Sequence, residues 1–373
     1  MAMDILLITQ DFPPECGGIQ TYMFELAREL LAQGHRVRVI CPGTRHDPNP
    51  LPALTDLVRV RTPGSWLFLP LLFLLPGYLR HHPSVTHVFY AQWQPALGAS
   101  LFARKARKYK SYCLVCGREL FTSVFGPLAP ALMRRVFKSM DAAFPISREV
   151  MRLLRERANP PGPLYLAHPG VDPGRFRPVD ADFLKIRYAV EGAPIVMSIT
   201  RMTPRKNLRQ VILALPSVLR EIPDAVLILC GEGEEKAALR ELAESLGLGK
   251  RVLFPGIIAE EELVAHFNLA DVFVLPSLTS KRDIEGFGIV FLEAGACETP
   301  VIATQAGGIP DAVENGETGL LTPPGALAEL EKALLYLLLN RDKAEAMGLR
   351  ARARILEQFT WSQAAARISA HME

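Results

Sequence analysis

The 373-residue sequence lacks several features that identify common classes of site. Among its six cysteines only Cys113 and Cys116 are close together, and no second pair completes a four-ligand zinc site. This Cys-x-x-Cys ends an apolar run, which favours buried or partly buried free thiols over a redox-active pair. Free cysteines are typical of a reducing compartment, so we expect a cytoplasmic protein.

Long apolar runs are scarce as well. The first run, Ile5–Ile8, is too short for a signal peptide. The longest run, Trp66–Leu79, is shorter than the ~20 residues that cross a bilayer, and Pro70 and Pro76 interrupt it. A membrane-spanning helix is therefore not expected. Two interpretations remain open, a helix in the protein core or an interfacial helix at a membrane surface.

Charge is distributed unevenly along the chain. Residues 1–180 contain 22 Lys and Arg against 13 Asp and Glu, whereas residues 181–373 contain 20 against 26. A basic half beside an acidic half suggests two domains with different partners. The densest basic cluster is either a solvated helix face or a contact with an anionic membrane surface, and it comprises Arg104, Lys105, Arg107, Lys108 and Lys110. No nucleic-acid recognition motif accompanies these residues, so nucleic acid is not an expected partner.

Short apolar runs alternate with amphipathic stretches along the whole chain, which predicts an α/β fold with parallel sheets. In the first half we predict a helix at 19–33 and strands at 4–9, 37–41, 58–61, 86–90, 112–115, 142–146 and 164–167. A Pro-, Gly- and Asp-rich segment at 169–182 reads as a linker, after which the order restarts. There we predict strands at 195–200, 225–230, 252–255, 272–275 and 300–303, a helix within 285–297, and helices at 208–220, 234–246, 325–339, 342–357 and 360–371.

The boundaries expected from this pattern are an amino-terminal domain at 1–175, a second domain at 176–357, and a carboxy-terminal helix at 358–373 that packs back towards the first domain. Ligands of open α/β sheets bind beyond the carboxyl ends of the strands. Candidate site residues should therefore lie in the loops that follow strands.

Two glycine-containing segments lie in such loops, but neither is a dinucleotide fingerprint. Gly17 and Gly18 follow the first predicted strand and open the first helix, where a backbone can approach an anion. A plain tight turn is an equally good interpretation of that pair. Gly231 and Gly233 belong to a fragment that lacks the third glycine of Gly-x-Gly-x-x-Gly.

A basic loop follows the first strand of the second half. Arg201 and Lys206 converge on one point if the loop curls over the end of the strand. The planar guanidinium and the compact ammonium together suit a diphosphate. The alternative is a surface loop that happens to be basic.

Two glutamates, Glu285 and Glu293, bracket seven mostly apolar residues. Their spacing does not place both on one helical face, so we expect Glu285 on the loop before a helix and Glu293 inside it. Gly286 and Gly288 leave backbone N–H groups free near that helix N-terminus. The segment thus offers donors for phosphate and acceptors for sugar hydroxyls. The alternative is a capped helix with one buried glutamate.

Taken together, these motifs resemble those of glycosyltransferase family 4, the retaining enzymes with two facing Rossmann-like domains of the GT-B fold and a cleft between them. The resemblance covers nearly the whole chain and implies that the amino-terminal domain at 1–175 binds the acceptor and that the domain at 176–357 binds the nucleotide-sugar. It is carried by Gly17-Gly18, His168 to Asp172, Ser198 to Arg201 with Lys206-Asn207, Gly231 to Gly233, Phe254 to Gly256, Asp271 to Pro276, Glu285 with Glu293, Pro300 to Ala303, Gly307-Gly308, Thr318-Gly319 and Phe359 to Trp361.

The resemblance implies roles for single residues. Arg201 and Lys206 are expected to hold the donor diphosphate, Glu293 to accept from the ribose hydroxyls and Glu285 to accept from hydroxyls of the transferred sugar. Backbone N–H groups of Gly286, Phe287, Gly288, Ile289 and Val290 are expected to donate to the sugar and phosphates. Gly256, Ile257 and Ile258 are expected beside the base, and Gly17 and Gly18 are expected to close over the diphosphate. No metal ion and no organic cofactor are implied, because cations and a helix dipole neutralise the leaving group.

The expected activity is therefore transfer of a sugar from a nucleotide-diphospho-sugar, with retention, to an unidentified acceptor that is either lipid-linked or another glycan or small molecule. A nucleotide-sugar epimerase and a non-catalytic nucleotide-sugar-binding protein are the alternatives. One position departs from the family pattern. Cys116 stands where a histidine that faces the donor sugar is common, and a thiol does not offer the donor and charge behaviour of imidazole.

Overall fold

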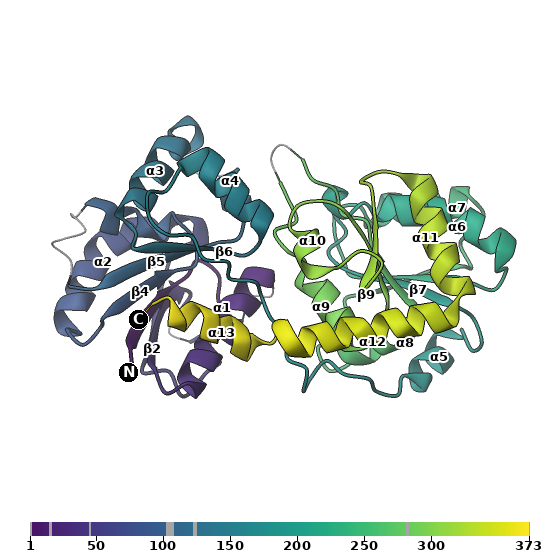
Figure 1. Cartoon of the computed structure of the whole chain (residues 1–373), viewed down its shortest axis with the longest axis horizontal. Helices are drawn as coiled ribbons and strands as arrows, with labels where there is room; N and C mark the ends of the chain where they lie inside the picture. Colours follow the sequence, from purple (N-terminus) through teal and green to yellow (C-terminus); the bar gives the residue numbers. More distant parts are fainter. Residues whose placement is uncertain are drawn as a thin grey trace. The chain divides into compact units, whose positions relative to one another are not determined.

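The computed structural model describes residues 2–14, 17–44, 46–101, 108–121, 125–280 and 283–372. The chain forms two compact units, one from Met1–Gly170 with Trp361–Glu373 and the other from Val171–Thr360. Each unit is a six-stranded parallel sheet with helices packed around it (Figure 1). The predicted α/β class is thus confirmed. Most of the predicted basic cluster falls outside the described residues, which include only Lys108 and Lys110 of it.

The sheet of the first unit has the strand order β3-β2-β1-β4-β5-β6. Its strands are β1 (Asp4–Ile8), β2 (Arg36–Pro42), β3 (Asp56–Val60), β4 (His87–Tyr90), β5 (Lys110–Val115) and β6 (Ala142–Pro145). Its helices are α1 (Gly18–Ala32), α2 (Phe68–His81), α3 (Ala129–Ser139), α4 (Arg148–Ala158) and α13 (Trp361–Ala370). The central strands β1 and β4 are buried along their whole length because both faces of a parallel sheet are covered.

The predicted strand at 164–167 is wrong. Only Leu164 forms an isolated bridge, to Ala143 on β6. The segment does follow β6, since the Tyr165 N–H donates to Ala143 and the Ala167 N–H donates to Pro145. Pro145 has no N–H to return a hydrogen bond, so the ladder ends there.

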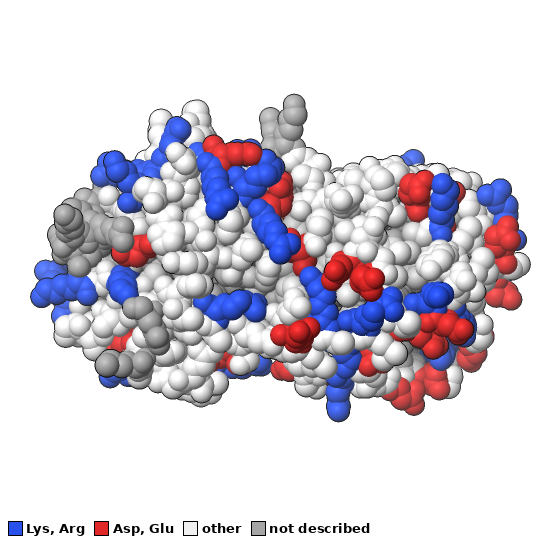
Figure 2. Space-filling view, viewed as in Figure 1, with Lys and Arg blue, Asp and Glu red and all other residues white. Residues whose placement is uncertain are grey.

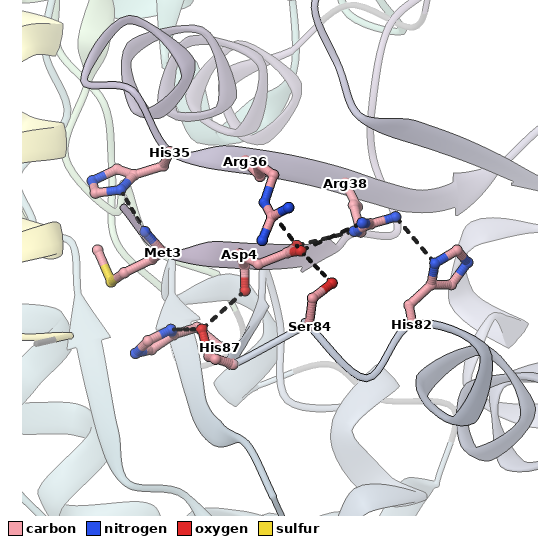
Figure 3. A network of polar contacts seen from close by, with 9 residues as sticks. Met3, Asp4, His35, Arg36, Arg38, His82, Ser84 and His87 are labelled. Carbon is pink, nitrogen blue, oxygen red and sulfur yellow. Dashed lines mark hydrogen bonds and ion pairs between the residues drawn. The ribbon is translucent and has the colours of Figure 1, made fainter. Parts of the chain in front are cut away.

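A polar network fixes the amino-terminal edge of this sheet (Figure 3). Asp4 on β1 is 3% exposed and pairs with Arg38 on β2 at 3.0 Å. The Ser84 hydroxyl donates to the same carboxylate at 2.7 Å, and Arg38 also contacts the His82 ring at 3.2 Å. Burial alone would raise the pKa of Asp4, but the bonds from Arg38 and Ser84 outweigh it and hold the pKa below its usual value. The network therefore ties β1, β2 and the segment before β4 in register.

Helix α13 returns the end of the chain to the first unit, where it packs against α1 (Figure 1). The Trp361 ring meets the Tyr22 ring edge-on with centroids 5.4 Å apart. Beyond the helix, the Met372 carbonyl oxygen lies 3.0 Å from the Tyr112 hydroxyl and 3.2 Å from the Lys110 ammonium. These contacts hold the last described residues against β5.

The sheet of the second unit has the order β12-β11-β10-β7-β8-β9. Its strands are β7 (Ile195–Ile199), β8 (Val226–Cys230), β9 (Val252–Gly256), β10 (Val272–Leu275), β11 (Val301–Thr304) and β12 (Gly319–Thr322). Its helices are α5 (Asp182–Tyr188), α6 (Leu208–Glu221), α7 (Lys236–Ser245), α8 (Leu263–Leu269), α9 (Ile289–Ala296), α10 (Ile309–Ala312), α11 (Leu327–Leu339) and α12 (Arg341–Gln358). The sequence pattern predicted neither β12 nor the short helices α5, α8 and α10.

The two sheets have the same order when each is counted from its own first strand. In both, the first strand lies between the second and the fourth, so the direction of winding reverses between the first and fourth strands. In open α/β sheets this switch point leaves a crevice beyond the carboxyl ends of the strands, where ligands bind. The loops after β1 and β4 in one unit, and after β7 and β10 in the other, are therefore the places to look for a site.

Two glycines allow α9 and α12 to pack at close range. A Cβ atom on Gly348 of α12 would lie 1.9 Å from the Glu298 carbonyl oxygen, just past the end of α9. A Cβ atom on Gly295 of α9 would lie 3.0 Å from the Ile355 side chain. Any side chain at Gly348 would therefore push the two helices apart.

The apolar run at 66–79 forms α2 and the turn before it. The buried side of α2 is lined by Phe68, Leu71 and Leu75, whereas Phe73 is 85% exposed. Among the described residues, no helix is both long enough and apolar enough to cross a membrane. On the face drawn in Figure 2, basic side chains predominate over the first unit and acidic ones are more frequent over the second, in line with the sequence.

The five described cysteines are free, and all are buried except the partly buried Cys116. This confirms the expectation of free thiols for the part of the chain that the structure describes.

Candidate active site

The basic loop after β7 and the acidic loop after β10 meet at the switch point of the second sheet. Glu285 accepts from the Lys206 ammonium at 2.5 Å and from the Arg205 guanidinium at 2.5 Å. The Ser277 hydroxyl, on the loop after β10, lies 3.4 Å from the same carboxylate oxygen. The Leu278 N–H donates to the Arg205 carbonyl at 2.7 Å and joins the two loops through their backbones. The predicted pair of Lys206 and Glu285 is thus brought together by neighbouring strands.

The electrostatics of this cluster keep Glu285 charged. Its side chain is only 12% exposed. Burial alone would raise the pKa of Glu285, but the charges of Lys206 and Arg205 outweigh burial and lower the pKa to about 2. The carboxylate is therefore an acceptor at neutral pH. Glu285 and Asp283, which pairs with Arg205 at 3.2 Å, together balance the charges of Lys206 and Arg205.

Arg201 supplies a further positive charge beside the cluster. It is exposed and has no ion-pair partner among the residues that the structure describes. Its charge acts on Lys206, which places the two cations near each other as predicted. With Arg205, the three cations face two carboxylates, Glu285 and Asp283, so one positive charge remains to favour a diphosphate.

Helix α9 begins at Ile289, so Glu285 lies on the loop before it and Glu293 lies inside it, as expected. The Glu293 carboxyl group forms no hydrogen bond or ion pair with any residue that the structure describes. Burial raises the pKa of Glu293 to about 7, and the distant charge of Arg175 opposes this only in part. Its carboxyl group is therefore a free acceptor whose charge changes near neutral pH.

The backbone around Gly286 to Val290 is shaped by two glycines. Gly288, which precedes α9, has a φ of 91°, a conformation that favours glycine. Gly307, after β11, has a φ of 55°, and a Cβ atom there would lie 2.3 Å from the Glu285 carbonyl oxygen. The Gly308 N–H donates to that oxygen at 2.8 Å. The Gly307-Gly308 loop thus holds Glu285 in place by its backbone.

The loops after β8 and β9 complete this edge of the sheet. A Cβ atom on Gly231 would lie 2.0 Å from the Thr200 carbonyl, and one on Gly233 would lie 2.2 Å from the Met202 carbonyl. These glycines let the loop after β8 pack directly on the loop that carries Arg201. Gly256 accepts from the Gly231 N–H at 2.7 Å, and the next residue, Ile257, is 78% exposed.

In the first unit, Gly17 precedes α1 and its carbonyl accepts from the Thr21 N–H at 2.9 Å. A Cβ atom on Gly18 would meet nothing within 4 Å, so that position is open. Gly17 and Gly18 belong to the first unit, whereas the other predicted donor-binding residues belong to the second.

Cys116 follows β5, and its N–H donates to the Glu119 carboxylate at 2.6 Å. Burial raises the pKa of the Cys116 thiol well above its usual value, so it stays neutral.

The sequence patterns assigned no role to three members of the cluster. Arg205 and Ser277 both contact the Glu285 carboxylate, and Asp283 pairs with Arg205 at 3.2 Å. The order Arg-Lys after a strand offered a signal for Arg205, whereas Ser277 has none in the sequence.

Comparison with known proteins agrees with this geometry. Residues 16–175 match the family model for glycosyltransferase family 4, and residues 181–354 match that for glycosyl transferases group 1. A GDP-mannose-dependent alpha-(1-6)-phosphatidylinositol monomannoside mannosyltransferase from Mycobacterium tuberculosis is 33% identical, over 98% of this chain and 97% of that protein. The chain belongs to glycosyltransferase family 4. This confirms the predicted glycosyltransferase with a nucleotide-sugar donor, and it does not favour the epimerase or the non-catalytic binding protein.

Two further proteins extend the comparison. A GDP-mannose-dependent monoacylated alpha-(1-6)-phosphatidylinositol monomannoside mannosyltransferase from Corynebacterium glutamicum is 28% identical, over 95% of this chain and 94% of that protein. The solved structure of sucrose-phosphate synthase from Thermosynechococcus elongatus superimposes with a TM-score of 0.81 at 25% identity, over 99% of this chain and 98% of that one. The family 4 assignment thus agrees with a structural likeness over the full length.

Proposed function

We propose that this glycosyltransferase moves mannose from GDP-mannose to a lipid-linked glycosyl acceptor at an anionic membrane surface, with retention and without a metal ion. The observation that carries the proposal is the cluster of Glu285 with Lys206 and Arg205 at the switch point of the second sheet. The choice of donor and acceptor draws on the mycobacterial and corynebacterial relatives, which span almost the entire chain.

The cationic cluster supports the metal-free part of the proposal. Lys206 and Arg205 now share the Glu285 carboxylate, and Arg201 stands beside them without a partner among the described residues. When a diphosphate binds here, its two phosphates replace Glu285 as the acceptor from these cations. The Glu285 carboxylate then accepts from hydroxyls of the transferred sugar. Fixed cations then neutralise the negative charge that develops on the leaving group.

The proposal assigns the ribose hydroxyls to the Glu293 carboxyl group. It lies within α9, has no hydrogen-bond partner among the described residues and can accept from two adjacent hydroxyls. In the proposed reaction the bond between the sugar and the diphosphate breaks and the acceptor oxygen bonds to the same face of the sugar. The leaving diphosphate takes the acceptor proton, so no protein nucleophile is needed.

The exposed side of α2 supports the membrane part of the proposal. Leu69 and Phe73 on α2, and Trp66 in the turn just before it, are 44%, 85% and 47% exposed. Arg80 and His81 lie in the last turn of the same helix. An apolar stripe with basic residues at its end is typical of a helix that lies in an anionic lipid interface. We therefore propose a cytoplasmic protein that binds the membrane peripherally.

The test is a transfer assay with the full chain and vesicles that contain phosphatidylglycerol and phosphatidylinositol monomannoside. We expect label from GDP-mannose to enter the lipid phase, with an α-linkage by NMR and with full activity in EDTA. UDP-glucose, UDP-N-acetylglucosamine and ADP-glucose serve as competing donors.

Each part of the proposal has its own contrary result. Preferred transfer from another donor would refute the choice of GDP-mannose. A β-linked product would refute retention, and loss of activity in EDTA that Mg²⁺ restores would refute the metal-free mechanism.

A further inference from the structure

The carboxy-terminal end of α12 is connected to the loop that carries Glu285 by two separate routes. This loop comprises residues 285–288, directly before α9, and we refer to it as the glutamate loop. Helix α12 runs alongside α9 (Figure 1). One route starts at Arg354 and passes through helix α10, and the other starts at Phe359 and passes through the ring of Phe287. The reaction described so far uses neither Arg354 nor Phe359.

Arg354 acts on the glutamate loop through α10. Its guanidinium donates to the carbonyl oxygens of Ala312 at 2.8 Å and Asp311 at 3.0 Å, at the end of this four-residue helix. The last carbonyl groups of a helix have no partner within it, and a single turn is marginal by itself, so the planar fork of Arg354 helps to hold α10. Just before α10, Gly308 donates its N–H to the Glu285 carbonyl at 2.8 Å. One helical turn thus connects Arg354 to the backbone of Glu285.

Phe359 acts on the same loop through a side chain. The ring centroids of Phe359 and Phe287 lie 6.0 Å apart, with the planes tilted by 45°. Both rings are buried, and the Arg354 guanidinium lies over the Phe359 ring, 4.7 Å from its centroid. The Phe359 carbonyl accepts from the Val171 N–H at 2.8 Å, which fixes its backbone. Since Phe287 stands between two glycines, its ring anchors the middle of the glutamate loop.

The proposed function requires a rigid glutamate loop. Glu285 is expected to accept from the transferred sugar, and backbone N–H groups between Gly286 and Val290 are expected to donate to the sugar and the phosphates. Donors that are fixed in advance stabilise a developing charge without reorganisation, and a small misplacement is costly. The bonds of Glu285 to Lys206 are exchanged when a diphosphate binds, whereas the contacts that start from α12 remain.

We propose that Arg354 and Phe359 are positioning residues for the donor. They act by holding the glutamate loop in the conformation that binds the nucleotide-sugar. This inference deepens the proposed function and rests on it for the identity of the donor. Loss of either side chain should therefore raise the KM for the donor and leave the KM for the acceptor unchanged.

The chain offers a matched control for each side chain. Arg350, one turn before Arg354 on α12, also donates to a carbonyl group, that of Glu317 at 2.9 Å, and like Arg354 it pairs with a glutamate. Phe176 is a buried ring like Phe359, with a guanidinium 4.8 Å from its centroid and another phenylalanine ring at 6.0 Å. The test variants are therefore Arg354→Ala and Phe359→Leu, and the controls are Arg350→Ala and Phe176→Leu.

Two measurements on the full chain test the proposal, both made below the lowest Tm of the set. Calorimetry with GDP-mannose measures donor binding, and hydrogen–deuterium exchange of the unliganded protein measures the glutamate loop itself. We expect Arg354→Ala and Phe359→Leu to bind GDP-mannose about tenfold more weakly and to exchange the amides of 285–290 about tenfold faster. Arg350→Ala and Phe176→Leu should match the wild type in both measurements.

Several outcomes would overturn the inference. Wild-type donor affinity in Arg354→Ala and Phe359→Leu is one, and an equal loss of affinity in the two controls is another. A lower kcat with both KM values unchanged is a third, because partial unfolding removes active protein without altering KM. If Phe359→Leu does not fold, Arg354→Ala decides the question, since the Arg354 side chain is 20% exposed.

The exchange measurement separates this inference from the proposed function, because it needs no ligand. Faster exchange of 285–290 in the test variants, together with weaker binding of a nucleotide-sugar other than GDP-mannose, would support the positioning role while refuting the proposed donor. Normal exchange and normal affinity in both test variants, in a protein that does transfer mannose, would refute the positioning role and leave the proposed function standing.

Discussion

The two sheets of this protein have one strand order but opposite chemistry at their carboxyl edges. At the switch point of the second unit, Glu285 is bound by Lys206 and Arg205 in a charged cluster with excess positive charge. At the switch point of the first unit, Gln92 and Gln94 present neutral amide oxygens without partners among the described residues. The shared topology provides two equivalent places for a ligand. The side chains on the loops then give one edge an ionic character and the other neutral amides.

The largest effect is expected from removal of the central cation in the second unit. Lys206→Ala should weaken binding of GDP-mannose about 100-fold, because a charge-assisted contact to the diphosphate is lost. Isothermal titration calorimetry measures this, with Arg209→Ala as the control because Arg209 is an exposed cation on α6. Unchanged affinity for GDP-mannose would show that the cluster is not the diphosphate site.

A smaller effect is expected at the surface of α2. Phe73→Ser should lower partitioning into phosphatidylglycerol vesicles about tenfold, because an exposed aromatic side chain no longer enters the lipid. Leu349→Ser on α12 is the matched control, since Leu349 is also apolar and 57% exposed. Flotation of the protein with vesicles provides the measurement. Equal loss of binding in both variants would remove any special role of α2.

The pH dependence of donor binding sharpens the comparison further, because Glu293 titrates near neutrality. With a pKa of about 7, its ionised fraction falls about tenfold between pH 8 and pH 6. Affinity for GDP-mannose should fall by up to that factor, since a protonated carboxyl group accepts fewer hydrogen bonds from the ribose. Calorimetry at the two pH values should show a flatter profile for Glu293→Gln. An unchanged pH profile of GDP-mannose affinity in this variant would show that Glu293 does not contact the nucleotide.

The last effect concerns stability rather than binding, at the same residue. Folding raises the pKa of Glu293, so its stabilising contribution is present below the unfolded value of 4.5 and is lost as the pH rises through about 7. Glu293→Gln should therefore raise the free energy of unfolding at pH 8 by roughly 3 kcal/mol and leave it nearly unchanged at pH 4.5. Urea denaturation at both pH values is the measurement. A destabilised variant at pH 8 would mean that the charged carboxylate has a partner that supports the fold.

The parts of the fold that were predictable from the sequence are those with strong local signals. The apolar runs located all twelve strands except β12, because buried parallel strands are apolar on both faces. The false strand at 164–167 is equally apolar, and what ends its ladder is the missing N–H of Pro145, a property of the neighbouring strand. The local pattern alone could not reveal that pairing.

The site shows the same limit. Lys206 and Glu285 were predictable because each follows a strand within a recognisable motif, and the structure brings them to 2.5 Å. Ser277 and Arg354 belong to no motif, and their polarity is ordinary for their positions. Their importance comes from the groups that they contact, which only the folded chain shows.

The close fit between Gly348 and the end of α9 has a consequence for experiments on ligand binding. Since the backbone of α12 at Gly348 packs closely on the Glu298 carbonyl, just past the end of α9, a shift of α9 should move α12 as well. Occupancy of the carboxyl group at Glu293 should therefore be detectable at a distance, as slower hydrogen–deuterium exchange along α12. A reporter on that long helix would follow nucleotide binding without any label near the nucleotide itself.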